Sequence, residues 1–220
     1  MQATTVSASR GDGWAVVRLI TPGGLNKLGS STLESLRDVL GSLLADPGVR
    51  CVAILGEGGS FAVGADLREI LRLDPRSARE FSLLGYSVFR IMEQSGTVVV
   101  AAIDGFCLGG GLDLALAADW RLGTDRSTFG HPGSDLGLIT GFGGTQRLPR
   151  LIGGRAALAW ALESRRVKAD EALRSGLLQE VCAPEEFGTR LEERIQHFLS
   201  LPAGRIEGAN AAMNGFFTTL

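Results

Sequence analysis

The chain has 220 residues, with 45% hydrophobic and 21% charged residues and a formal net charge of −2 at pH 7. These proportions are typical of a single globular domain with a sizeable core and argue against a disordered chain. Lysines and arginines form no cluster, which argues against a nucleic-acid partner or an anionic membrane surface. No apolar run approaches the roughly 18–20 residues that a membrane helix needs, so no membrane partner is expected.

Three cysteines, Cys51, Cys107 and Cys182, are scattered in apolar surroundings without a CxxC spacing. An odd number of such cysteines is typical of reduced thiols in a cytoplasmic protein. Residues 1–10 lack the basic start and apolar stretch of a signal peptide, which agrees with a cytoplasmic location. Two distant histidines and unclustered cysteines cannot form a plausible zinc site, so no metal is expected.

Strands and helices alternate in the first half of the chain. Strands are predicted where β-branched residues concentrate, at 14–20, 49–55 and 97–103. One helix is predicted to begin at a capping box at 31–34. Two later helices are predicted at 75–93 and at 112–119. The order strand, turn, glycine loop, helix occurs twice, which suggests two stacked copies of one supersecondary unit.

The second half is predicted to begin with short strands after Trp120 and to continue mainly as helices. These helices are predicted at 154–163, at 169–175 and from 184 onward, with a last one over 201–220. No stretch has the composition of a linker between domains. The chain is therefore predicted to form one core domain, residues 1–200, followed by a short C-terminal helical segment, residues 201–220.

Glycines gather at two junctions between a strand and a helix, Gly64-Ala65 and Gly109-Gly110. A helix N-terminus leaves backbone N–H groups unpaired, and glycine lets a ligand approach them closely. Two such N–H groups facing one point would stabilise an oxyanion. Tight turns or close packing of helix on sheet would equally explain these glycines. A dinucleotide site or P-loop is disfavoured, because neither glycine pattern follows these strands.

The sequence resembles the crotonase superfamily, which contains enoyl-CoA hydratases and isomerases, from about residue 14 to residue 200. Four segments carry the resemblance in family order and spacing: Gly-Leu-Asn-Lys-Leu at 24–28, Phe-Ala-Val-Gly-Ala-Asp-Leu at 61–67, Asp-Gly-Phe-Cys-Leu-Gly-Gly-Gly-Leu-Asp at 104–113 and Gly-Gly-Thr-Gln-Arg-Leu at 143–148. The resemblance implies an α/β fold, a spiral of ββα units that usually assembles as a homotrimer or hexamer. It also implies an acyl-CoA substrate, with coenzyme A carried on the substrate and no separate cofactor.

The resemblance assigns the oxyanion hole to the N–H groups of Ala65 and Gly110, which would hold the thioester oxygen as an enolate forms. It assigns the adenine and pantetheine path to residues around the first glycine junction, Ala62, Gly64, Ala65, Asp66 and Leu67. Lys27 would reach a CoA phosphate, although a solvated lysine is an equally good interpretation. Family members usually continue further with helices that close the site, so a neighbouring subunit would close it here, or it is more open.

The chain departs from the family at the two glutamates with which hydratases position and activate water. The first position is Asp113, one methylene shorter, and the second is Gly133, which has no side chain. Efficient hydration is therefore in doubt, because a proton-transfer group must lie within about 2.6–3.2 Å of its target. A purely structural aspartate in the first helical turn is the alternative for Asp113.

Two nearby residues are candidates to replace the missing carboxylate. His131 is one of only two histidines and lies in the segment that should border the site. Asp135 follows the lost glutamate by two residues, so the two positions share a face if this stretch is extended. If His131 is catalytic, its imidazole would serve as the acid or base. Either residue could instead be an ordinary hydrogen-bonded or exposed polar side chain without a catalytic role.

The main hypothesis is an acyl-CoA lyase or isomerase of the hydratase/isomerase type, which stabilises a thioester enolate and moves a proton through Asp113 with His131 or Asp135. One carboxylate suffices for double-bond migration, and a decarboxylase needs no base. The second hypothesis is a non-catalytic subunit that binds acyl-CoA or an acyl carrier. A serine hydrolase using Ser60 or Ser134 is the weakest, since neither serine has a GxSxG frame.

Overall fold

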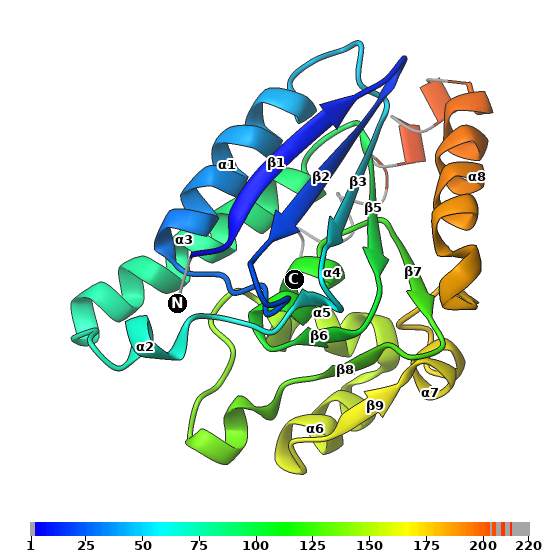
Figure 1. Ribbon diagram of the computed structural model, residues 1–220. Helices are drawn as coiled ribbons and strands as arrows, with labels where there is room; N and C mark the ends of the chain where they lie inside the picture. Colours follow the sequence, from blue (N-terminus) through cyan, green and yellow to red (C-terminus); the bar gives the residue numbers. More distant parts are fainter. Residues whose placement is uncertain (1–2, 203, 206–207, 210–211, 213–220) are drawn as a thin grey trace.

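The computed structural model describes residues 3–202, 204–205, 208–209 and 212. Its centre is a six-stranded sheet in the order β1-β2-β3-β5-β7-β10 (Figure 1). Only β1 and β2 pair antiparallel, and every other neighbouring pair in this sheet is parallel. The strands are β1 Thr5–Arg10, β2 Trp14–Ile20, β3 Cys51–Gly56, β5 Val98–Ile103, β7 Trp120–Thr124 and β10 Glu180–Cys182.

Both faces of this sheet are covered, which explains why β5 is buried at every position. Alternate residues of β5 enter two different cores: Val99 and Ala101 join the cluster formed with α1 and α3, while Val100 joins the cluster formed with α8. Figure 1 shows α8 on one side of the sheet and α1 and α3 on the other. These helices are α1 Ser30–Leu44, α3 Pro75–Glu93 and α8 Phe187–Ser200.

A second, four-stranded sheet has the order β4-β6-β8-β9, from β4 Ser60–Ala62, β6 Phe106–Leu108, β8 Thr128–Gly130 and β9 Arg166–Lys168. Parallel pairing joins β3 to β5 in the large sheet and β4 to β6 in the small one. The two predicted copies of one unit are therefore stacked on each other. The remaining elements are α2 Leu67–Ile70, α4 Gly110–Leu116, η1 Pro132–Leu136, α5 Gly144–Ile152, α6 Gly154–Leu162, α7 Ala169–Arg174 and η2 Pro184–Glu186.

The predicted start of α1 is wrong. The helix begins at Ser30 after Gly29, and its N-cap residue makes no side-chain hydrogen bond. The carboxylate of Glu69, from α2, accepts from the Ser30 N–H at 3.0 Å. A tertiary contact thus replaces the local capping box. The strand β1 was not predicted, and most of the predicted 201–220 helix lies outside the described residues.

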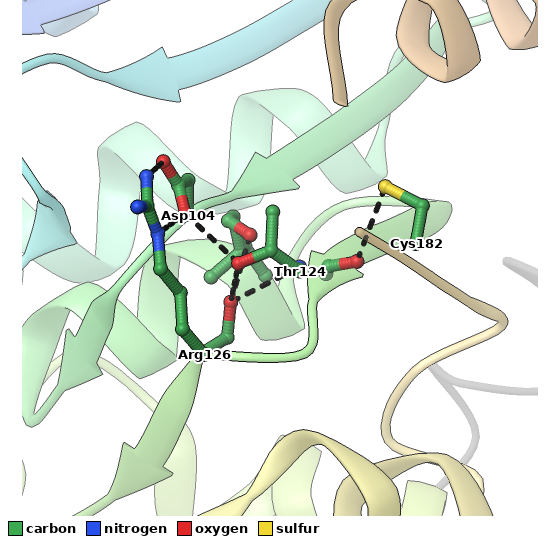
Figure 2. Close-up of polar contacts among 7 residues, drawn as sticks. Asp104, Thr124, Arg126 and Cys182 are labelled. Atoms are coloured by element: carbon green, nitrogen blue, oxygen red, sulfur yellow. Dashed lines mark hydrogen bonds and ion pairs between the residues drawn. The ribbon is translucent and has the colours of Figure 1, made fainter. Parts of the chain in front are cut away.

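The turn between β5 and β6 is clamped by an acidic side chain. Asp104 accepts from Thr124 Oγ1 at 2.8 Å and from Arg126 Nε at 2.6 Å (Figure 2). The adjacent guanidinium lowers the pKa of the Asp104 carboxyl below its usual range. This clamp fixes the turn that leads through β6 into the second glycine junction.

All three cysteines are buried and free of disulfides, as the sequence predicted for reduced thiols. Burial raises the pKa of the Cys51 thiol to about 12 and that of Cys107 well above its usual range. Within the described part of the chain, no helix is long and apolar enough to cross a membrane.

Candidate active site

The two glycine junctions bring two backbone amides side by side. Gly64 and Gly109 have φ values of +104° and +53°, a region that favours glycine. A Cβ atom built on Gly64 would lie 3.4 Å from the Gly110 nitrogen, and one built on Gly110 would lie 3.6 Å from the Ala65 nitrogen. Among the described residues, neither of these two N–H groups donates a hydrogen bond. Both are free for a ligand oxygen.

Hydrogen bonds to the segment after β2 hold the first junction. Val63 N–H donates to the Asn26 carbonyl at 2.8 Å, and Leu28 N–H donates to the Gly64 carbonyl at 2.9 Å. The Asn26 side chain is buried and donates to the Ser60 carbonyl at 2.8 Å. The Ala65 amide is therefore set by backbone contacts, and the Gly110 amide is set by the start of α4.

Asp113 lies one turn after Gly110 on α4 and is completely buried. Its Oδ1 lies 2.7 Å from His131 Nε2, and its Oδ2 accepts from the hydroxyl of Thr140. His131 follows β8 directly, and its side chain is 12% exposed. The structure thus joins the first glutamate position to one of the two candidate substitutes. Thr140 donates to the carboxylate, and a carboxylate in its ionised form can only accept from the imidazole as well.

The start of α5 packs closely against the Asp113–His131 pair. Gly144 is the first residue of α5, and a Cβ atom there would overlap Asp113 Oδ1 and lie 2.9 Å from His131 Nε2. Only a glycine fits at this position without moving the carboxylate. Beside it, the ring of Phe142 covers the Cα of Gly110, where an added Cβ would lie 2.8 Å from the ring.

A buried arginine anchors the segment that carries Phe142 and Gly144. Arg147 makes two hydrogen bonds to the Glu93 carboxylate of α3, at 2.6 and 2.9 Å, and a third to the Phe142 carbonyl at 2.6 Å. Only 6% of its side chain is exposed. Bidentate pairing of this kind fixes orientation as well as distance. The start of α5 is therefore held in place from α3.

A cavity of about 210 Å³ opens next to the pair. Its polar lining residues are His131, Ser134, Thr140 and Thr145. The rest of the wall comes from the segment after η1, from α5 and from α6, and it is mainly aliphatic. Of the Asp113–His131 pair, His131 is the member that lines the cavity.

The second candidate substitute is not brought to the pair. Asp135 would share a face with position 133 only if this stretch were extended, and residues 133–135 instead form η1. Pro132 starts this turn, and Gly137, with a φ of +70°, ends it. Asp135 is exposed, and no hydrogen bond joins it to the pair in the described structure. The Cα of Gly133 faces Leu138 instead.

The predicted CoA path runs along β4 and the start of α2. Ala62 and Gly64 are buried, Ala65 and Asp66 are partly exposed, and Leu67 is 47% exposed. Lys27 Nζ lies 4.0 Å from Asp66 Oδ2, so its ammonium group stands at this path and has a carboxylate neighbour. The arrangement agrees with either interpretation of Lys27.

The two serines have structural roles. Ser60 is buried, donates to the Gly24 carbonyl and accepts from the Asn26 N–H at 3.1 Å. Ser134 is paired with the hydroxyl of Ser164 at 2.5 Å. Within the described residues, neither hydroxyl contacts the His131 ring, and no cluster of His, Cys, Asp or Glu could hold a metal ion. The geometry does not favour a serine hydrolase.

Thr140, Gly144 and Arg147 were missed as site residues. The last two lie in the glycine-rich segment that carried part of the family resemblance, which was the available signal. Nothing in the local pattern around Thr140 indicates that its hydroxyl meets Asp113, since the contact spans 27 residues.

A family model described as enoyl-CoA hydratase/isomerase matches residues 9–218. The chain belongs to this family. A crotonyl-CoA hydratase of Syntrophomonas wolfei is 38% identical over 201 residues, which cover 91% of this chain and 77% of the relative. A short-chain-enoyl-CoA hydratase of Clostridium acetobutylicum matches with the same identity and coverage.

The crystal structure of an enoyl-CoA hydratase from Bacillus anthracis matches this chain with a TM-score of 0.90 and 30% identity, covering 97% of this chain and 83% of that one. These matches confirm the predicted crotonase fold and an acyl-CoA-processing enzyme of the hydratase/isomerase type. Membership in the enoyl-CoA hydratase/isomerase family also favours the enzyme over the non-catalytic subunit.

Proposed function

We propose that the enzyme moves the double bond of an enoyl-CoA thioester, with the Asp113–His131 pair as its proton-transfer unit. The observation that carries this proposal is the 2.7 Å contact between Asp113 Oδ1 and His131 Nε2, with Asp113 one turn after Gly110 on α4. No second carboxylate among the described residues reaches this pair. The arrangement suits a reaction that needs one acid–base group and no activated water.

The tautomer of His131 follows from its partner. An ionised carboxylate can only accept, so Nε2–H donates to Asp113 and the lone pair resides on Nδ1. Because His131 lines the cavity and its side chain is partly exposed, whereas Asp113 is completely buried, His131 is the catalytic base and Asp113 is the positioning residue. Thr140 holds the other carboxylate oxygen and so fixes the orientation of the pair.

The reaction then proceeds without any other protein acid. His131 takes a proton from C2 of a 3-enoyl thioester, and the electron pair delocalises onto the thioester oxygen. The N–H groups of Ala65 and Gly110 stabilise that oxygen, a contribution that typically amounts to roughly 10²–10³ in rate for each donor. The imidazolium returns the proton to C4, and the product is the conjugated 2-enoyl thioester. Coenzyme A is part of the substrate, and no separate cofactor is involved.

Substitutions of His131 test its assignment as the catalytic base. Formation of a 2-enoyl thioester from 3-hexenoyl-CoA is followed by its conjugated absorbance, in wild type, His131→Ala and His131→Gln. A glutamine can still donate to Asp113 but cannot accept and return a proton. Both variants are expected to lose about 10²–10⁴ in kcat. Substantial activity in His131→Gln would transfer the base role to Asp113 and leave His131 as the positioning residue.

Hydration is the second candidate, because the relatives named above are hydratases. Loss of the conjugated absorbance of crotonyl-CoA measures it in the same set of variants. Hydration faster than isomerisation in the wild type would overturn the proposed reaction. It would also show that one short carboxylate with a histidine suffices for addition of water.

We also propose a homotrimer or hexamer in the cytoplasm. Two large exposed aliphatic side chains, Leu71 just after α2 at 85% and Leu83 on α3 at 50%, support an assembly that covers them. Three buried free thiols support a reducing compartment. Light scattering on the purified chain gives the assembly mass, and a monomer would contradict the first part.

A further inference from the structure

The cavity beside the Asp113–His131 pair has a mainly apolar wall with a few polar side chains. The polar lining residues are His131, Ser134, Thr140 and Thr145. The apolar wall contains aliphatic side chains, among them Leu148 of α5, which is 4% exposed overall. A site that is mostly apolar with a few convergent polar groups is the usual form of a small-molecule pocket.

The volume of the cavity limits what it can hold. Pockets for drug-sized ligands measure about 300–1,000 Å³, so a cavity of about 210 Å³ is small by comparison. The cavity therefore suits a short aliphatic chain better than a long one.

Two alanines on α6 set this limit. Ala157 and Ala161 are four residues apart, lie on one face of the helix and both line the cavity. Trp160, on the same helix, is buried in the main core and does not line the cavity. A larger side chain at either alanine would occupy the space that the small residues leave.

We propose that this cavity receives the acyl group and that Ala157 and Ala161 restrict the substrate to short acyl chains. This inference rests on the proposed function, because it places the reacting carbons at His131. The aliphatic side chains of the wall then hold the tail of the acyl group. Leu158, 59% exposed, lies at the rim of the cavity, where longer chains would pass into solvent.

Binding of saturated acyl-CoAs tests the inference without any turnover. Calorimetry with the full chain compares CoA, butyryl-CoA, hexanoyl-CoA and decanoyl-CoA, so that the CoA portion is subtracted. Wild type is compared with Ala161→Leu and with Ala159→Leu, a matched change on the same helix outside the cavity. Ala157→Val is the second variant, because it adds less bulk than Ala161→Leu.

We expect hexanoyl-CoA to bind wild type more tightly than butyryl-CoA, with little further gain for decanoyl-CoA. Ala161→Leu should weaken hexanoyl-CoA by about tenfold or more, the usual effect of mismatched bulk in an apolar pocket, and Ala159→Leu should not. An unchanged ratio of hexanoyl to butyryl affinity in Ala161→Leu and Ala157→Val overturns the inference.

The proposed reaction is judged separately by the 3-hexenoyl-CoA assay. Tight chain-length-dependent binding without isomerisation would overturn only the proposed reaction. Isomerisation with an unchanged chain-length profile in the α6 variants would overturn only the acyl-site assignment. Failure of wild type to bind any acyl-CoA would overturn both.

Discussion

The two halves of the site are built in different ways. The amides of Ala65 and Gly110 belong to the backbone, and glycines and sheet hydrogen bonds set their positions. The pair Asp113 and His131 consists of side chains that come from α4 and from the end of β8. The first half is positioned by glycines and by supporting contacts that do not include the proton-transfer residues. The second half depends on single residues, so one oxyanion site can serve a different proton-transfer group and a different reaction.

Removal of the buried carboxylate is the strongest way to separate the two halves. Asp113→Ala should lower kcat for 3-hexenoyl-CoA by about 10²–10⁴, because His131 loses the partner that fixes its tautomer. Acyl-CoA affinity should change little, since the amides remain. Asp113→Asn should retain more activity than Asp113→Ala, because an amide oxygen can still accept from Nε2. Equal kcat in Asp113→Ala and wild type would remove Asp113 from the reaction, and absence of turnover in wild type with intact acyl-CoA binding would favour the non-catalytic hypothesis.

A change at Gly144 tests how tightly the side-chain half is held. The new methyl group in Gly144→Ala overlaps Asp113 Oδ1 and must displace the carboxylate. A shift of about 1 Å at a reacting group can cost 10²-fold, so a loss of about that size is expected in kcat. The control is Gly188→Ala on α8, where an added Cβ meets nothing within 4 Å. A Gly144→Ala variant with wild-type kcat would contradict a rigid pair.

The smallest effect is expected for the clamp that supports the backbone half. Arg126 lowers the pKa of Asp104, so this pair stabilises the fold above the ordinary carboxyl pKa of about 3.9 and ceases to do so as pH falls through the folded pKa. Arg126 is largely exposed, which limits the gain. Asp104→Asn should lower Tm at pH 7 by about 1–3 °C. Its deficit should shrink below pH 4, and a deficit that is constant with pH would contradict the ionic contribution.

Local patterns predicted the fold well. The bounds of α3 and the strand at 14–20 were correct, since periodicity and terminal residues agree there. The start of α1 was wrong, and the extended form of residues 133–135 on which the case for Asp135 depended is not found. In the first case a distant carboxylate, Glu69, caps the helix, and in the second Pro132 with a glycine turn creates η1.

The site was only partly predictable. The resemblance indicated both amides and Asp113, and His131 was identified as a candidate because few other titratable groups lie near the gap. Thr140 and Gly144 act through contacts that only the folded chain creates. Pattern and spacing describe neighbours along the chain, whereas the choice between His131 and Asp135 depended on whether a short segment turns or extends.

The alkylation rates of the buried thiols can report how often parts of the folded structure open. Only a thiolate reacts readily with alkylating reagents, and both burial and the raised pKa suppress that form for Cys51 and Cys107. Cys107 Sγ lies 3.5 Å from the Gly111 carbonyl, directly under the start of α4. Its alkylation rate in the native protein therefore measures how often the oxyanion junction separates. Cys51, in the central sheet, measures how often the whole domain unfolds.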